Sequence, residues 1–186
     1  MTGVNDSVRA TTREIARAAG VSEGSLYNHF ESKEALFLAL LKELPGEFVQ
    51  VVMRLPSQAG HGTVQERLDE LVRAALTHYR QTLPMGSSIL TDSALLERHR
   101  ALLREQGAGP HRANQAMAAY LRAEQELGRV RADVDPDTVS YMLLGACLQY
   151  VYWTTFMGES SFVPPEESFA RELVATVVRA LAPAGE

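Results

Sequence analysis

Cysteine is nearly absent from this sequence of 186 residues, in which Cys147 is the single thiol. One cysteine excludes an intrachain disulfide and a multi-cysteine metal site, and it fits the reducing cytoplasm. Positive charge is also scarce, because 18 lysines and arginines stand against 23 acidic residues, for a formal net charge of −5. Bulk charge therefore gives no indication of a nucleic-acid partner. The first residues lack the apolar segment of a signal peptide, so we expect a cytoplasmic protein.

Long hydrophobic runs are also missing. Residues 138–158 carry no formal charge, and about 20 apolar residues would span a bilayer. However, Ser140, Gln149, Thr154 and Thr155 interrupt this stretch, and no basic cluster flanks it. We therefore expect the central helix of a helical bundle and no membrane segment.

The motifs of common enzymes and metal sites do not occur. Glu97 and His99 are only two residues apart, and Glu70 is followed at the third position by Arg73, so no Glu-x-x-His motif is present. A His-Glu-x-x-His motif, a phosphate-binding glycine loop and a G-x-S-x-G turn are missing too. The histidines are scattered without ligand spacing: His29, His61, His78, His99 and His111. We expect no enzymatic activity, no metal and no cofactor.

The sequence shows helical periodicity of its apolar residues and no alternating pattern typical of strands. We therefore expect an all-α fold. Asp135-Pro136 is the strongest helix start, because aspartate caps free N–H groups and proline prefers the first helical position. Beyond residue 45 we expect a loop at 56–63 and helices at about 64–83, 86–105, 111–127, 136–158 and 165–182.

The N-terminal region begins with the most informative segment, TTREIARAAGVSEGSLYNHFESKEAL at residues 11–36. Thr11 and Glu14 have the spacing of a capping box, which satisfies backbone donors at a helix start. Gly20 supplies the left-handed conformation that a sharp turn needs at the end of this helix.

A second short helix follows the turn. Ser22 is positioned to cap it, and Leu26 and Phe30, four residues apart, form its buried stripe. Two short helices crossing over a glycine turn make a helix-turn-helix, whose second helix can enter the major groove of DNA.

The segment GVSEGSLYNHFESKEAL resembles the TetR (tetracycline-repressor-like) family at the turn, the recognition helix and the start of the fourth helix. This resemblance covers about residues 11–44. It implies a homodimeric transcription regulator with a helix-turn-helix DNA-binding domain at 1–44 and an effector-binding and dimerisation domain at 45–186. It further implies a repressor that a small-molecule effector releases from double-stranded operator DNA.

The resemblance also implies the roles of individual residues in DNA binding. Two residues lie where the family's second helix contacts the DNA backbone or an edge base: Thr12 and Arg13. Three lie where base-reading side chains occur: Glu23, Gly24 and Asn28. Four match phosphate-contacting positions: Ser25, Tyr27, His29 and Lys33. Hydroxyl, imidazole and ammonium groups all donate to phosphate oxygens. Outside this motif, Tyr27 would more simply pack and His29 would lie solvated.

Two features depart from the family pattern. Residues 1–44 carry five basic and six acidic side chains. The ten residues before Thr11 lack the apolar stripe of the family's first helix, so this helix is missing from the expected fold. A misassigned start, a shortened chain and a natural variant would all explain this. The alternative function is therefore a helical ligand-binding or partner-binding protein that has lost its DNA affinity.

The aromatic stretch at 141–157 suggests the effector site, since small-molecule sites are mostly apolar with a few polar groups. The candidates on this helix and its neighbours are His78, Tyr120, Tyr141, Cys147, Gln149, Trp153 and Phe156. The simpler alternative for each of them is the protein core. We expect a largely apolar effector.

The final helix has a broad apolar face formed by Phe169, Leu173, Val177 and Leu181. In the family, the last two long helices pair with those of a second chain. The resemblance therefore implies that this face is the dimer interface, whereas packing onto the chain's own core is the alternative.

Overall fold

The computed structural model describes Ser22, Gly24, Ser25 and residues 46–105, 107, 109–158 and 162–183. The helices within these ranges are α-helices and one short 3-10 helix, and no strand occurs in them. The expected all-α fold is therefore confirmed. None of the described helices is long and apolar enough to cross a membrane, in agreement with the interpretation of residues 138–158 as a bundle helix.

The chain divides into two compact units. The larger unit comprises residues 45–83 and 105–186, and the smaller comprises residues 1–44 and 84–104. In the smaller unit the structure describes the end of α5 (Val64–Thr91) and most of α6 (Ser93–Glu105). Ile89 and Leu95 are buried there, with Leu96 packed against them.

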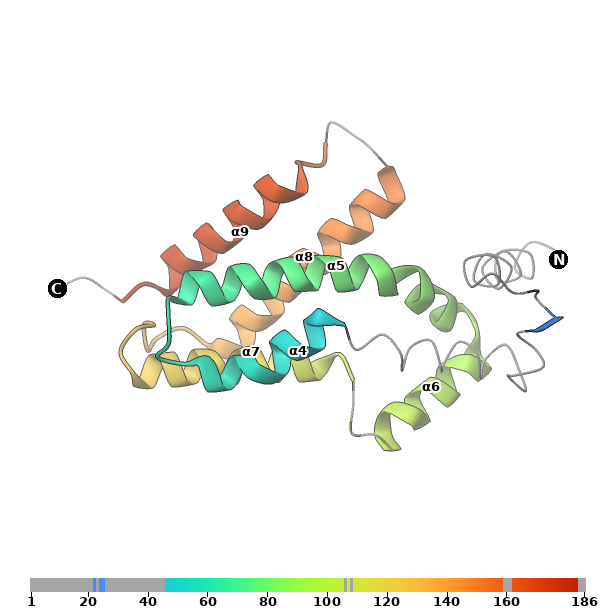
Figure 1. Ribbon diagram of the computed structural model, residues 1–186, viewed down its shortest axis with the longest axis horizontal. Helices are drawn as coiled ribbons and strands as arrows, with labels where there is room; N and C mark the ends of the chain where they lie inside the picture. The colour runs from blue at the N-terminus through green and yellow to red at the C-terminus, as the bar shows by residue number, and fades with distance from the viewer. Residues whose placement is uncertain are drawn as a thin grey trace. The chain divides into compact units, whose positions relative to one another are not determined.

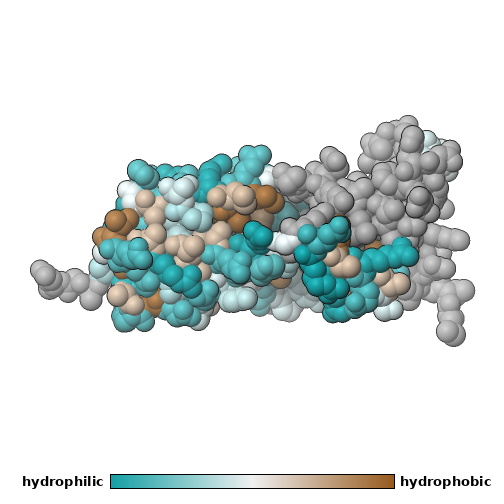
Figure 2. Space-filling view, turned by 90° about the horizontal axis from the view of Figure 1, so that it is seen from below, coloured by the Kyte–Doolittle hydropathy of each residue, from teal (hydrophilic) through white to brown (hydrophobic). Residues whose placement is uncertain are grey.

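The larger unit is a helical bundle (Figure 1). Besides the first part of α5, its elements are α4 (Glu47–Arg54), the 3-10 helix η1 (Leu55–Gln58), α7 (His111–Glu126), α8 (Pro136–Met157) and α9 (Glu166–Leu181). α7 packs against α4, η1 and α8, and α8 also contacts α9. Viewed from below Figure 1, the surface is mainly hydrophilic, with smaller apolar patches between the polar groups (Figure 2).

The core of this unit is made mainly of aliphatic side chains, with a few aromatic rings, and every helix contributes to it. Its fully buried members include Leu55, Leu71, Met117, Leu143 and Val151. Full burial of such a side chain stabilises the fold by about 1.5–3 kcal/mol relative to exposure. The bundle therefore rests on apolar packing, and its polar contacts fix the helix ends.

Helix α5 begins with a reciprocal capping box. The Thr63 N–H donates to Glu66 Oε2 (2.9 Å) and the Glu66 N–H donates to Thr63 Oγ1 (3.1 Å). The backbone N–H and the hydroxyl of Thr63 lower the pKa of Glu66, because both favour its ionised carboxylate. The loop predicted at residues 56–63 ends at this cap. Its first residues belong to the 3-10 helix η1.

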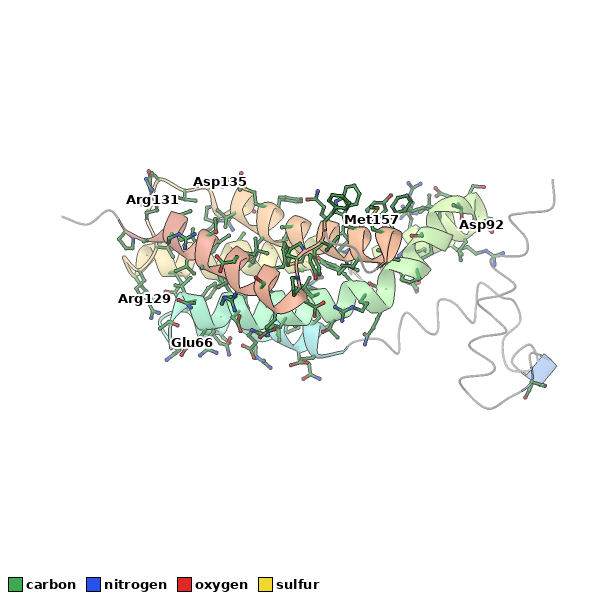
Figure 3. The ribbon with its side chains drawn as sticks, turned by 90° about the horizontal axis from the view of Figure 1, so that it is seen from above. Glu66, Asp92, Arg129, Arg131, Asp135 and Met157 are labelled. Atoms are coloured by element: carbon green, nitrogen blue, oxygen red, sulfur yellow. The ribbon has the colours of Figure 1, made fainter. Side chains whose placement is uncertain are left out.

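Helices α7 and α8 end and begin where the sequence predicts. Gly128 adopts φ +71°, a left-handed conformation that stops α7. Asp135 caps α8 through its carboxylate, which accepts from the Thr138 N–H (3.0 Å), and Pro136 takes the first helical position. Figure 3 shows Asp135 at this end of the helix and Met157 at the other.

Replacing Asp135 with alanine should lower the melting temperature by a few degrees, because the cap of α8 is lost. The hydroxyl and N–H of Thr138 lower the pKa of Asp135. Because the pKa of Asp135 is lower in the folded protein, its ionised form stabilises the fold at pH values above the unfolded pKa of about 3.9. This stabilisation disappears as the pH falls through the folded pKa. Thermal scans of both proteins should therefore differ at pH 7 and converge in acid. A constant difference down to pH 2 would contradict this explanation.

The predicted break between helices at residues 84–85 is wrong. α5 continues through Pro84 to Thr91, and the interruption lies at Asp92. The Asp92 carboxylate accepts from the N–H groups of Ala94 and Leu95, both at 3.0 Å, and so caps α6. A proline weakens a helix interior without always ending it, whereas this aspartate satisfies two free donors of a new helix.

Candidate functional site

The candidate DNA-binding segment is described at three residues. The Ser25 N–H donates to Ser22 Oγ (3.1 Å), so Ser22 caps this helix as predicted. Gly24 is exposed, and among the described residues a Cβ atom there would meet Ser22 Oγ at 3.9 Å, an ordinary contact. Seven candidates lie outside the described residues: Thr12, Arg13, Glu23, Tyr27, Asn28, His29 and Lys33.

Two of the seven effector candidates, His78 and Cys147, lie in the interior beside α4 and α5. His78 is half-buried and stacks on Phe48, with ring centroids 4.7 Å apart. Burial lowers the pKa of His78 and raises the pKa of Cys147 to about 12. Burial and the neighbouring Cys147 raise the pKa of Tyr79 to about 12. All of these groups are uncharged at pH 7, so this part of the interior is electrically neutral.

A third effector candidate, Tyr120, is fully buried in α7 one turn before Glu124. Glu124 is itself fully buried, although it carries a carboxylate. Its Oε1 accepts from the Gly60 N–H (3.1 Å), and its Oε2 lies 3.0 Å from Arg129 Nε. The Arg129 guanidinium also donates to the Gly62 carbonyl (2.5 Å). Figure 3 shows Arg129 and Glu66 near the same end of the bundle. Glu124 therefore ties the turn before α5 to α7.

The other four effector candidates do not join this interior. They lie on the side of α8 that points away from the chain's own core. The sequence, by contrast, suggested that all seven candidates line a single pocket. Together with their apolar neighbours these four residues form what we call the outer α8 face: Tyr141, Met142, Leu148, Gln149, Tyr152, Trp153 and Phe156. Exposed fractions reach 66% at Tyr141 and 71% at Phe156. The core side of the same helix is taken by Leu143, Cys147 and Val151.

The predicted dimer face of α9 turns toward the chain's own core. Leu181 is buried, and Phe169, Leu173 and Val177 are partly buried and packed against that core. The Phe169 ring stacks on Tyr150 with centroids 4.2 Å apart, and the Tyr150 hydroxyl donates to the Pro164 carbonyl (2.9 Å). These four residues thus fit the alternative of packing within one chain.

Sequence reasoning missed the polar residues that organise the bundle. Glu124 gave no signal, because a glutamate in a helix is normally solvated and only the packed structure buries it. Phe48 and Tyr79 were also missed, although their aromatic character beside His78 offered a hint. Within the described residues, no three His, Cys, Asp or Glu side chains are grouped to hold a metal ion.

Two family models match separate parts of the chain. Residues 8–40 match the model of "Bacterial regulatory proteins, tetR family". Residues 96–183 match the model of the "AefR-like transcriptional repressor, C-terminal domain". The two segments together cover more than half of the sequence, in the order in which a regulator of this kind carries them.

Individual relatives are similar over part of their length. The HTH-type transcriptional repressor AcnR of Corynebacterium diphtheriae is 29% identical over 134 residues, which are 70% of this chain and 62% of AcnR. The nucleoid occlusion factor SlmA of Glaesserella parasuis is 35% identical over 91 residues, 47% of this chain and 42% of SlmA. The chain therefore spans less than two thirds of either relative.

The fold is similar to solved structures. A TetR-family transcriptional regulator from Mesorhizobium loti superimposes with a TM-score of 0.60 at 20% identity, over 95% of this chain and 91% of that one. This likeness agrees with the predicted all-α fold class, and the match of residues 8–40 agrees with the predicted N-terminal helix-turn-helix region.

Proposed function

Because this chain belongs to the TetR family of bacterial transcriptional regulators, we propose that it is a repressor that a small-molecule effector releases from its operator. The observation that carries this proposal is the succession of a DNA-binding match and a repressor C-terminal match on one chain. We assign DNA binding to residues 1–44, and effector binding and dimerisation to residues 45–186. The protein acts in the cytoplasm, where its DNA lies, and it catalyses no reaction.

The helix that Ser22 caps is the proposed recognition helix. A glycine in a helix costs about 0.5–1 kcal/mol relative to alanine, and the missing side chain at Gly24 would let DNA approach the backbone closely. Glu23 and Asn28 face base edges in this proposal. The remaining candidates contact the DNA backbone: Thr12, Arg13, Ser25, Tyr27, His29 and Lys33.

Two substitutions in this helix-turn-helix should affect DNA binding differently. Lys33→Ala should weaken binding to all sequences alike and reduce the salt slope by about one, because one phosphate contact is lost. Asn28→Ala should cost about 1–3 kcal/mol at one base position, if the amide makes a bidentate contact with a base. Mobility-shift titrations against the DNA beside the protein's own gene, at several salt concentrations, measure both effects.

The matched control is Arg171→Ala, which removes the same charge from the exposed surface of α9. It should leave the affinity and the salt slope unchanged. If the wild-type protein shows no salt-dependent binding to any duplex, the chain is instead a helical binding protein without DNA affinity.

The proposed dimer is formed by the outer α8 face of two copies. Monomeric proteins rarely expose a continuous apolar surface of this kind, and it runs along the whole of α8. A two-fold dimer buries the same patch on both subunits. The partly exposed edge of α9, with Leu173 and Val177, would border this interface.

The proposed effector site is the interior around His78 and Cys147, whereas the third buried candidate, Tyr120, lies one turn from Glu124 on α7. The polar groups of this site are neutral, so an apolar effector with few charges suits it. Phe48 on α4 stacks directly on His78, and α4 follows the DNA-binding region in the sequence. An effector that displaces Phe48 would change the position of α4. By linkage, the effector and the operator must then weaken each other's binding equally.

A further inference from the structure

The chain passes between its two compact units at three points: 44–45, 83–84 and 104–105. A residue type that interrupts or weakens helices occurs at each of them: Pro45 before α4, Pro84 inside α5 and Gly107 after α6. Hinges between rigid parts of a protein are a few loop or helix-end residues that absorb a change of backbone angles. All three connections therefore have the composition of a hinge.

Helix α5 belongs to both units and contributes to two separate cores. Leu83, the last residue before Pro84, packs against the core of the larger unit, whereas Ile89 is buried in the smaller unit with Leu95. The two cores share no member among the described residues. Apolar packing therefore fixes the two ends of α5 to different units, and Pro84 lies between them.

Two local features weaken α5 at this junction. The Pro84 nitrogen carries no hydrogen and cannot donate to the Arg80 carbonyl, and the proline ring crowds that carbonyl. The Thr82 hydroxyl donates to the His78 carbonyl (2.9 Å), a side-chain bond that often bends helices. We therefore expect α5 to bend most easily just before Pro84.

The connection after α6 is organised in a similar way. Gly107 (φ +53°) and Gly109 (φ +148°) adopt backbone conformations that side chains disfavour, so α6 ends and the chain turns. The Arg112 guanidinium donates to the Gly107 carbonyl (2.6 Å), which attaches this linker to α7 in the larger unit. The pivot of this connection therefore lies at the end of α6.

The end of α5 and the helix α6 form a single piece. Ile89 and Leu95 are buried together. Asp92, labelled in Figure 3, lies between the two helices: its N–H donates to the Ile89 carbonyl (3.3 Å), and its carboxylate caps α6. Residues 84–104 belong to the same compact unit as residues 1–44.

We propose that residues 84–104 move with residues 1–44 as one rigid body, and that α5 bends at Pro84 when they move. The body that carries the DNA-binding segment then includes α6, which the sequence assigned to the effector domain. A glycine linker after α6 and Pro45 before α4 allow the same movement at the other two connections.

This movement has a regulatory consequence that rests on the proposed repressor function. His78 of the proposed effector site lies less than two turns before Pro84, and its carbonyl accepts the bond from Thr82. An effector that displaces His78 would therefore act directly on the bend in α5. This gives the effector site a second connection to the DNA-binding region besides α4.

Distances between pairs of spin labels on the whole protein test the rigid body. Cysteines replace exposed residues, and Cys147 stays unlabelled because it is buried. Labelled chains are diluted with unlabelled protein, so that each dimer carries one pair. The first pair lies inside the smaller unit, the second inside the larger unit, and the third across the two: Gly24→Cys with Ala101→Cys, Gln65→Cys with Ala119→Cys, and Gln65→Cys with Ala101→Cys.

We expect narrow distance distributions for the first two pairs and a broad one for the third. A broad distribution for the first pair together with a narrow one for the third would overturn the proposal, because α6 would then belong to the larger body.

Pro84→Ala locates the hinge. Pro84 is exposed, so alanine restores a backbone donor to α5 without removing a buried side chain. The distribution of the third pair should become narrower, and amide exchange in residues 80–88 should slow. Pro56→Ala is the matched control, an exposed proline at the start of η1 in the larger unit, and should leave the distribution unchanged. An unchanged distribution in Pro84→Ala would refute the assignment of the hinge to Pro84.

Addition of the DNA beside the protein's own gene distinguishes this inference from the proposed function. Binding should shift the third distance and leave the first unchanged, whereas a shift of the first distance alone would overturn the rigid body. If no DNA binds, the repressor proposal fails, and the distances in the free protein still decide whether residues 84–104 move with residues 1–44.

Discussion

Replacing both Leu148 and Tyr152 with glutamate should convert the proposed dimer into monomers. The two side chains are exposed one turn apart near the middle of the outer α8 face. A two-fold interface repeats each change on both subunits, so four carboxylates would be buried without partners. Each buried unpaired charge costs several kcal/mol. We therefore expect the dimer to weaken about 1000-fold or more, because about 4 kcal/mol corresponds to three orders of magnitude.

Size-exclusion chromatography with light scattering measures this change at micromolar concentration. Trp153, the single tryptophan, lies on the same face, so its emission should shift to longer wavelength in the monomer. Operator affinity should fall as well, because one subunit carries only one recognition helix. Far-ultraviolet circular dichroism should stay unchanged, since neither side chain belongs to the chain's own core.

The matched control is Met53→Glu on α4, where the methionine is 74% exposed and lies outside this face. It should remain dimeric. A double variant that stays dimeric, or a wild-type protein that is monomeric at micromolar concentration, would refute the proposed interface.

Replacing Glu124 with alanine should give the largest loss of stability among the polar residues described. The change leaves the Gly60 N–H and the partly buried Arg129 without their acceptor. Breaking a fully buried ion pair costs about 3–5 kcal/mol. Since Arg129 keeps some solvent contact, we expect about 3 kcal/mol, which lowers the melting temperature by about 6–12 °C for a chain of this size.

Arg122→Ala offers a matched control on the same helix, because Arg122 pairs with Asp137 and both side chains are about half exposed. Exposed pairs are worth about 0–1 kcal/mol. Thermal and urea unfolding at one protein concentration should separate the two variants clearly. Equal effects would mean that burial of Glu124 adds nothing to its pairing.

The sequence predicted most helix ends of the larger unit, because those ends depend on local chemistry. Asp135 and Pro136 start α8, and Gly128 stops α7, through hydrogen bonds and backbone angles within a few residues. The one misplaced break shows the limit of such signals. α5 continues through Pro84, and the Asp92 side chain satisfies two donors and so decides where α6 begins.

The sequence also determined the family, since the motif at residues 11–36 depends on the order of residue types and not on their packing. The roles given to Asn28, Lys33 and their neighbours remain predictions of that motif. The mobility-shift titrations of Asn28→Ala and Lys33→Ala distinguish two proposed roles in this segment, base reading and phosphate contact.

Only the tertiary structure decided which faces of α8 and α9 turn inward. α8 is apolar on most sides, so its periodicity does not distinguish a core stripe from an interface stripe. Leu143, Cys147 and Val151 are buried because α7 and α9 lie on that side, and Trp153 and Phe156 are left outside for the same reason. On α9 the chain's own core buries Leu181 and covers most of the face that the sequence predicted at the dimer interface. When polar residues occupy one side of a helix, the sequence predicts which side faces solvent. When a helix is apolar on most sides, the helices packed against it determine which side is buried.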